Sequence, residues 1–369
     1  MTTYIIYSFI LIGTTISAYL YEKATKEHFK IIFYIVSFFI PFFFLAIRYD
    51  IGTDYHNYVE YFYRINSGEE IKKEIAYIYI NKFIGDFNLN VQWLFIFFGF
   101  FFMFFSYKSF PKDGFALSVF FFIVIVYLYE GFSAIRQGLA VAIMAYASKY
   151  IYKKEFSKYF LWSLIAMTFH LIAGFLLLIV YPFINRKYNK YILLCFIILF
   201  FVIFRFTNLH EILLLNIGAL FPKYEWYLHS KYMQPSQISS GFGMMLKVFI
   251  ALLVVFYKDK IVKKYQQANI MINMYMIYIF FMLLRLKIMI FGRVEHIFIY
   301  SQIFVIVYFI NIFKFRSKIL VSTLILGIYF VIYLKYISTG TNKEDNFINP
   351  YQTIIGEFRN ENRFCNYLG

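Results

Sequence analysis

The chain has 369 residues, of which 62% are hydrophobic, 24% aromatic and only 15% charged. An ordinary soluble domain has about 45–50% apolar and about 25% charged residues, so this composition excludes a soluble fold and predicts an all-α, polytopic integral membrane protein. The net charge of +16 would favour a nucleic-acid partner in a soluble protein. In a membrane protein the cations mark cytoplasmic loops instead, and we expect no nucleic-acid partner.

Twelve apolar runs follow one another along the chain. They cover residues 3–21, 31–47, 91–107, 115–129, 134–152, 158–170, 171–184, 191–206, 242–257, 268–284, 296–313 and 319–335. The first run is followed rather than preceded by cations, which is the reverse of a signal peptide and predicts a retained span. Since about 20 apolar residues cross a bilayer, we expect about 12 transmembrane helices in a single domain, 1–369.

Short basic connectors recur at every second link between these runs. They begin near Lys23, Lys108, Lys149, Arg186, Lys258 and Lys314. The positive-inside rule places them in the cytoplasm, so segments 48–90 and 207–241 and the tail 338–369 are predicted to be extracytoplasmic. We expect interfacial or re-entrant helices in 48–90 and an amphipathic surface helix in 207–241.

Residues 157–184 allow two interpretations. One helix of 28 residues would be about 42 Å long and would invert every later connector. Two short arms that meet near His170 keep the alternation of charge, and half-length helices are tolerated where they line a cavity. The alternation therefore favours two arms.

The arginines are distributed differently from the lysines. Eight of the ten arginines, all but Arg186 and Arg316, lie outside the basic connectors. Lys and Arg serve equally well as topology signals, so this excess needs another cause. A guanidinium binds phosphate or carboxylate bidentately, and an anion site on the outer face would explain the excess. Snorkelling to lipid headgroups is the alternative for any single arginine.

The first polar group follows the second apolar run, in the sequence RYDIGTDYHNY. Arg48 stands there with two carboxylates, Asp50 and Asp54, and Tyr55 comes next. Unpaired charge beside a membrane is costly, so this grouping indicates a functional site. An Asp that caps the following helix is the alternative explanation.

Three further groups occupy predicted outer ends of the runs. Arg136 follows Glu130 closely and stands in the first turn of a helix, where a cation opposes the helix dipole and indicates a bound anion. His170 interrupts an apolar run and is either structural or a base or hydrogen-bond donor. Arg285 and Arg293 flank an outer turn, where neighbouring cations repel one another unless they share an anion.

The order and spacing of these segments resemble the EpsG family. The matching runs are RYDIGTDYHNY, EIAYIYINKF, SAIRQGLAVAI, TFHLIAG and FGRVEHIFIY, with Asn349-Pro350-Tyr351 near the end. EpsG proteins are similar to the Wzy polymerases of bacterial surface polysaccharides. The resemblance implies an inverting, metal-independent glycosyltransferase in the bacterial plasma membrane. It would polymerise polyprenyl-diphosphate-linked oligosaccharides into O-antigen, capsule or exopolysaccharide on the extracytoplasmic side, without a cofactor.

The resemblance also implies roles for individual residues. The expected diphosphate and substrate contacts are Arg48, Arg136, Arg285, Arg293, Tyr55, Glu130 and Gln137. The acceptor hydroxyl needs a base within hydrogen-bond reach, and the topology makes His170 and Asp54 the two candidates.

Besides the lipid bilayer, the partners implied are a flippase and a chain-length regulator. A ligase acting on lipid-linked glycans and a flippase or transporter are the alternative functions. A transporter would carry its coupling charges near the membrane midplane, whereas here the charges gather at one boundary, which favours an enzyme.

Overall fold

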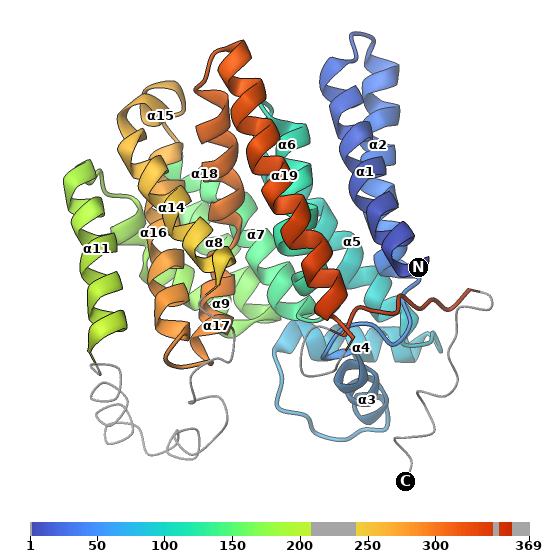
Figure 1. Cartoon of the computed structure of the whole chain (residues 1–369). Helices are drawn as coiled ribbons and strands as arrows, with labels where there is room; N and C mark the ends of the chain where they lie inside the picture. Colours follow the sequence, from blue (N-terminus) through green and yellow to red (C-terminus); the bar gives the residue numbers. More distant parts are fainter. Residues whose placement is uncertain (1, 208–240, 342–346, 356–369) are drawn as a thin grey trace. The chain divides into compact units, whose positions relative to one another are not determined.

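The computed structural model of the protein describes residues 2–207, 241–341 and 347–355 (Figure 1). Within these ranges the fold is all-helical, and the only pairing of extended backbone is an isolated antiparallel bridge between Arg48 and Thr353. The predicted all-α class is confirmed. The segment 208–240, where an amphipathic helix is predicted, lies outside the described residues.

Two compact units divide the chain. The first comprises Met1–Tyr150, Glu155–Leu178 and Leu320–Gly369, and the second comprises Ile151–Lys154 and Ile179–Ile319. The first unit contains α1 (Thr2–Lys23), α2 (Glu27–Ala46), α3 (Tyr55–Asn66), α4 (Ile75–Asp86), α5 (Gln92–Ser109), α6 (Phe115–Phe122), the π-helical η1 (Ile123–Gly131), α7 (Ile135–Tyr152), α8 (Phe156–Phe169), α9 (Leu171–Ile179) and α19 (Phe315–Thr339). The second contains α10 (Tyr181–Ile184), α11 (Lys190–Phe206), α14 (Phe242–Phe256), α15 (Lys258–Lys264), α16 (Ala268–Arg285), α17 (Phe291–Ile297) and α18 (Tyr300–Asn311).

Four helices of the described residues are long and apolar enough to cross a membrane alone, namely α1, α2, α16 and α19. The pair α17 and α18, bent by 49°, makes a fifth if it is one broken span. The protein is therefore a membrane protein, but the predicted count of 12 spans is not confirmed. Several of the predicted runs form helices that are shorter than a bilayer crossing, among them α8 with 14 residues and α9 with nine.

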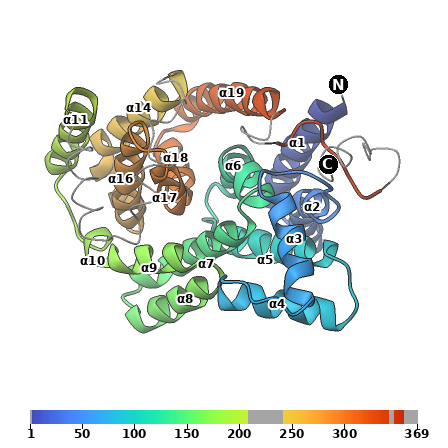
Figure 2. The same ribbon diagram turned by 90° about the horizontal axis from the view of Figure 1, so that it is seen from below.

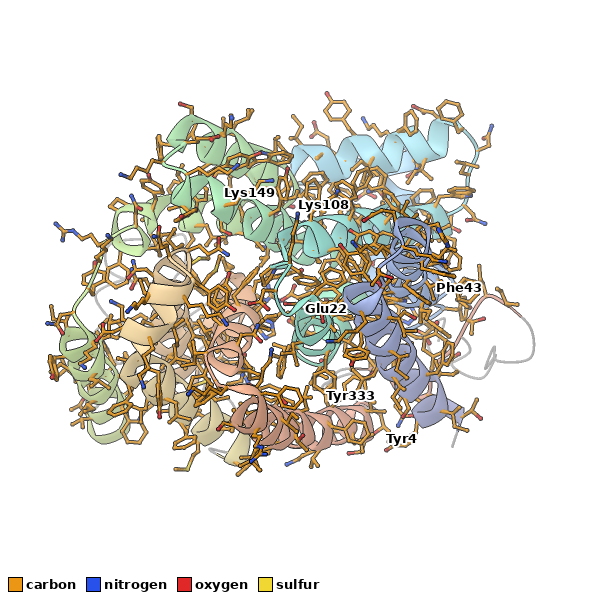
Figure 3. The ribbon with its side chains drawn as sticks, turned by 90° about the horizontal axis from the view of Figure 1, so that it is seen from above. Tyr4, Glu22, Phe43, Lys108, Lys149 and Tyr333 are labelled. Atoms are coloured by element: carbon orange, nitrogen blue, oxygen red, sulfur yellow. The ribbon has the colours of Figure 1, made fainter. Side chains whose placement is uncertain are left out.

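The first unit has two ends of different character. At one end the loop after α2 meets the start of α5, because Gln92 Nε2 donates to the carbonyl of Arg48 at 3.1 Å. Helices α3 and α4 lie across this end, which is the lower one in Figure 1. The opposite ends of α5 and α7 carry Lys108 and Lys149, and Figure 3 looks down on that side. The separation of basic and mixed-charge ends follows the predicted alternation of connectors.

The chain breaks at His170, as the two-arm interpretation predicts. His170 has an extended backbone (φ −153°, ψ 101°) between α8 and α9. The two helices run side by side in Figure 2, and Tyr159 near the start of α8 donates to Leu177 O near the end of α9 at 2.8 Å. Gly174 permits this approach, since a Cβ there would lie 2.6 Å from Ser163 O. Residues 156–179 are thus a hairpin of two short helices.

Candidate functional site

The site is built around the loop 47–54, which joins α2 to α3. Asp50 and Gly52 have left-handed backbones, with φ of 51° and 99°. Gly52 is required by the packing as well, because a Cβ there would lie 2.2 Å from Phe132 O. This close contact presses the loop against the junction of η1 and α7, where Ser133 Oγ accepts the Thr53 N–H at 3.1 Å.

Arg48 lies inside the fold beneath this loop. Its side chain donates to Gly131 O, and its guanidinium carbon lies 4.5 Å from the Phe95 ring centroid and 5.4 Å from that of Phe132. Arg48 is only 1% exposed, and burial lowers its pKa to about 10, so it stays protonated at neutral pH. The structure therefore gives Arg48 a scaffold position that pins the loop to η1.

Asp50 and His56 are in close contact, a pair that the sequence did not single out. His56 Nε2 lies 2.6 Å from Asp50 Oδ1, and the carboxylate side chain is 2% exposed whereas the imidazole is 34% exposed. The left-handed turn at Asp50 folds the loop back so that a carboxylate and a histidine six residues later meet. The only feature of the sequence that could have indicated this pair is the six-residue spacing of Asp50 and His56 across the turn at Gly52 and Thr53.

Arg136 forms the second feature of the site. Its guanidinium pairs with Glu74, which immediately precedes α4, and its carbon lies 5.1 Å from the Tyr77 ring centroid and 6.0 Å from that of Tyr58. The side chains of Arg136 and Glu74 are 18% and 20% exposed. The anion predicted at Arg136 is thus, in this structure, a carboxylate of the same chain.

An open hollow of about 610 Å³ lies beside Arg136, within the first unit. The residues that line it are Lys72, Lys73, Glu74, Ile75, Arg136, Met167, Thr168 and Leu171. Three cations and one carboxylate give the lining a net positive charge, and Ile75, Met167 and Leu171 add apolar side chains to it. The volume is in the range of small-molecule sites, which is about 300–1,000 Å³.

Asp54 is linked to this hollow through Tyr58. Asp54 immediately precedes α3, and Tyr58, one turn later, accepts a hydrogen bond from Arg136. Burial raises the pKa of Tyr58 to about 12, with the negative charge of Asp54 adding to that rise and Arg136 opposing it. The predicted Tyr55, by contrast, is 3% exposed and stacks on Phe95 with ring centroids 4.9 Å apart, so it belongs to the core.

His170 caps a helix at the edge of the hollow. Its Nδ1 accepts the N–H of Ala173 at 3.3 Å, in the first turn of α9. Two close neighbours of His170, Thr168 and Leu171, line the hollow. Because Nδ1 accepts this bond, the neutral ring carries its proton on Nε2, and a base function would disrupt the cap.

Two further predicted residues are buried. Glu130 is 0% exposed in η1, and Gln137 is 6% exposed in α7. The two helices are held close together here, since a Cβ on Gly138 would lie 2.7 Å from Glu130 O. Both residues therefore lie within the packed junction that supports the loop.

The second unit holds the remaining predicted cations. Arg285 at the end of α16 donates to Glu295 Oε2 at 2.9 Å, and Lys247 lies 3.4 Å from Glu295 Oε1. Glu295 is 1% exposed, and the two cations that share this buried carboxylate are Arg285 and Lys247, not Arg285 and Arg293 as predicted. Arg293 is exposed on α17.

The sequence model of the EpsG family matches residues 31–353, which include the loop, the hollow and the Glu295 cluster. The chain belongs to the EpsG family. No curated protein and no solved structure shows significant similarity to it. EpsG membership indicates a membrane protein of the polysaccharide-polymerase type.

The residues predicted in this EpsG protein thus fall into separate places. Three of them belong to the surroundings of the hollow: Arg136 lines it, Asp54 is linked to it and His170 adjoins it. Four are buried in the first unit, namely Arg48, Tyr55, Glu130 and Gln137. The other two, Arg285 and Arg293, belong to the second unit. Sequence reasoning missed Lys72, Lys73, Glu74 and His56. A signal for the first three was present, because a short charged run directly before an apolar helix supplies groups for a site at its N-terminus.

Proposed function

We propose that this EpsG protein polymerises surface polysaccharide from polyprenyl-diphosphate-linked repeat units, on the extracytoplasmic side of a bacterial plasma membrane. The observation that carries this proposal is the hollow beside Arg136, whose lining combines three cations with apolar side chains. A lipid-linked glycan has an anionic diphosphate next to an apolar chain, and the lining of the hollow offers cations together with apolar side chains. Two of the apolar lining residues, Ile75 and Leu171, are exposed, each with 58% of its surface accessible.

The reaction transfers the growing glycan to the terminal sugar of another lipid-linked unit. An acceptor oxygen bonds to the anomeric carbon, the bond from that carbon to the diphosphate breaks, and the diphosphate leaves with the electron pair. Negative charge grows on the leaving group in the transition state, and cations already in place stabilise it more than they stabilise the ground state. Attack on the face opposite the diphosphate inverts the anomeric centre.

Arg136 is the residue expected to contribute most to this step. Its planar guanidinium can hold two phosphate oxygens, and Lys72 and Lys73 add point charges to the same lining. The diphosphate would then replace Glu74 as the partner of Arg136. His170 is assigned as a hydrogen-bond donor to the substrate through Nε2–H, while roles for Arg285 and Arg293 stay predictions from the family resemblance.

A deletion strain and the purified protein together test this proposal. Loss of a polymerase leaves single repeat units on the surface lipid, whereas loss of a flippase or a ligase leaves no surface glycan. The purified protein in lipid vesicles should convert a lipid-linked repeat unit into a ladder of longer glycans, also in the presence of a metal chelator. A deletion strain without surface glycan, together with no ladder in vesicles, would refute the proposal.

A further inference from the structure

Asp50 is held more rigidly than a surface loop residue. The backbone N–H of Tyr49 donates to Gln352 O at 3.0 Å, and that of Gly52 donates to Phe347 O at 2.9 Å. Both sides of Asp50 are thereby tied to the C-terminal segment 347–355, and the residue between them adopts φ of 51°. Non-glycine residues rarely adopt this conformation, and such strain is concentrated at functional sites.

His56 is positioned by the same loop. It is the second residue of α3, and this helix begins where the Tyr55 N–H donates to Gly52 O at 3.1 Å. The buried carboxylate of Asp50 contacts Nε2, while a third of the imidazole side chain is exposed. A carboxylate inside the fold and an accessible imidazole outside it form the arrangement in which an acid orients a catalytic base.

The contact with Asp50 also determines which ring nitrogen can act as the base. Because Nε2 lies 2.6 Å from a carboxylate oxygen of Asp50, we expect the neutral ring to carry its proton on Nε2 and its lone pair on Nδ1. His170 has the opposite arrangement, because its Nδ1 lone pair accepts the Ala173 N–H. Of these two histidines, His56 therefore has the tautomer expected of a general base.

Helix α3 connects this pair to the hollow. His56 and Tyr58 both stand in its first turn, and Tyr58 accepts a hydrogen bond from Arg136, which lines the hollow. One short helix of the first unit therefore carries both His56 and the tyrosine that contacts Arg136, two positions apart along the chain.

We infer that His56 is the general base of the glycosyl transfer and that Asp50 is its positioning residue. This inference rests on the proposed function, which supplies the acceptor hydroxyl. The proton of that hydroxyl moves to His56 Nδ1 as its oxygen bonds to the anomeric carbon, and the diphosphate leaves with the electron pair. The imidazolium formed is stabilised by the Asp50 carboxylate and later returns its proton to water.

The test uses the full-length protein in lipid vesicles, a synthetic lipid-linked repeat unit and three variants. His56→Gln retains a donor toward Asp50 but removes the base. Asp50→Asn suits the left-handed turn, since Asn tolerates it, but removes the charge that balances the imidazolium. His28→Gln, an exposed position in the first turn of α2, is the matched control. Each protein is assayed for polymer formation between about pH 5 and 8 and, separately, for binding of the lipid diphosphate.

His56→Gln should lose at least about 100-fold in polymerisation rate, the range general-base catalysis contributes, while it binds the lipid diphosphate as the wild type does. The acidic limb of the wild-type pH–rate profile should disappear from its residual activity. Asp50→Asn should fall less, because its amide oxygen can still lie against Nε2, and His28→Gln should match the wild type. Wild-type rates and an unchanged pH profile in His56→Gln would overturn the inference.

Failure of the proposed function itself would look different. In that case the wild-type protein would form no glycan ladder and would not bind the lipid diphosphate, whatever stands at position 56. If Asp50→Asn proves unstable in a thermal melt, His56→Gln still decides the outcome, since a third of its side chain is exposed and the wild-type pH profile supplies an independent measurement. A wild-type profile without an acidic limb would also count against His56.

Discussion

Replacing Arg136 by lysine should separate a phosphate-binding guanidinium from a cation that only marks an interface. The change keeps the positive charge but removes the planar fork that can hold two oxygens. Arg136 lines the hollow, is 18% exposed and already pairs with a carboxylate there. If the side chain at position 136 only has to reach the membrane surface, lysine should function there as well as arginine.

The expected loss follows from the contacts that lysine cannot make. One hydrogen bond to a charged group in a partly buried site contributes about 1.5–3 kcal/mol. At about 1.4 kcal/mol per factor of ten, losing one of two such bonds to phosphate should weaken binding by roughly 10–100-fold. Arg64→Lys is the control, because Arg64 is 40% exposed and pairs with Glu60 and Glu69 at the surface, where ion pairs contribute about 0–1 kcal/mol.

Binding of labelled lipid diphosphate to the protein in vesicles measures this loss, and glycan length on a gel measures its consequence. Glu74→Gln should not weaken binding of the lipid diphosphate, because it removes the carboxylate that the phosphate must displace from Arg136. Its affinity for the diphosphate should equal or exceed that of the wild type. Wild-type affinity and full-length glycan in Arg136→Lys would refute the assignment, and so would a loss in Glu74→Gln as large as that in Arg136→Lys.

Other predictions concern the fold that supports the site. Gly52→Ala should destabilise the protein by about 2–5 kcal/mol in a thermal melt, since it adds strain and a backbone clash. Gly68→Ala, with φ of 88° but no atom within 4 Å of the added Cβ, should cost only about 1–2 kcal/mol, and equal losses would contradict the packing argument. Glu295→Gln should lower stability by about 3–5 kcal/mol because two cations lose their shared carboxylate, and an unchanged melting temperature would show that the contact is unimportant. Reporter fusions should place Ser67 outside the cell and Lys154 in the cytoplasm, and reversed signals would overturn the predicted topology.

Features that depend on the local sequence were predictable. Apolar runs and few charges determine a helical membrane protein, because in lipid every backbone polar group must be satisfied within a helix or a closed barrel. The break at His170 followed from the alternation of basic connectors, and the structure confirms it. Composition could not supply the number of spans, since several apolar runs form helices too short to cross alone.

The partners of the charged residues were decided only by the tertiary structure. Arg136 pairs with a carboxylate 62 positions away, and Arg48 donates to a carbonyl 83 positions away. Neither distance in sequence leaves a periodic signal, because such contacts arise from how whole helices pack. Arg48 and Arg136 look equivalent in the sequence. In the structure, however, Arg48 is buried in the scaffold and Arg136 lines the hollow.

The pair of Asp50 and His56 was only partly predictable from the sequence. Both residues stand in one short segment, but they meet only because the backbone turns left-handed at Asp50 and the C-terminal segment holds the loop. The composition and hydropathy of the chain determined that it forms helices in a membrane. Which polar groups those helices bring together was determined by long-range packing, which satisfies each buried charge with the nearest available partner.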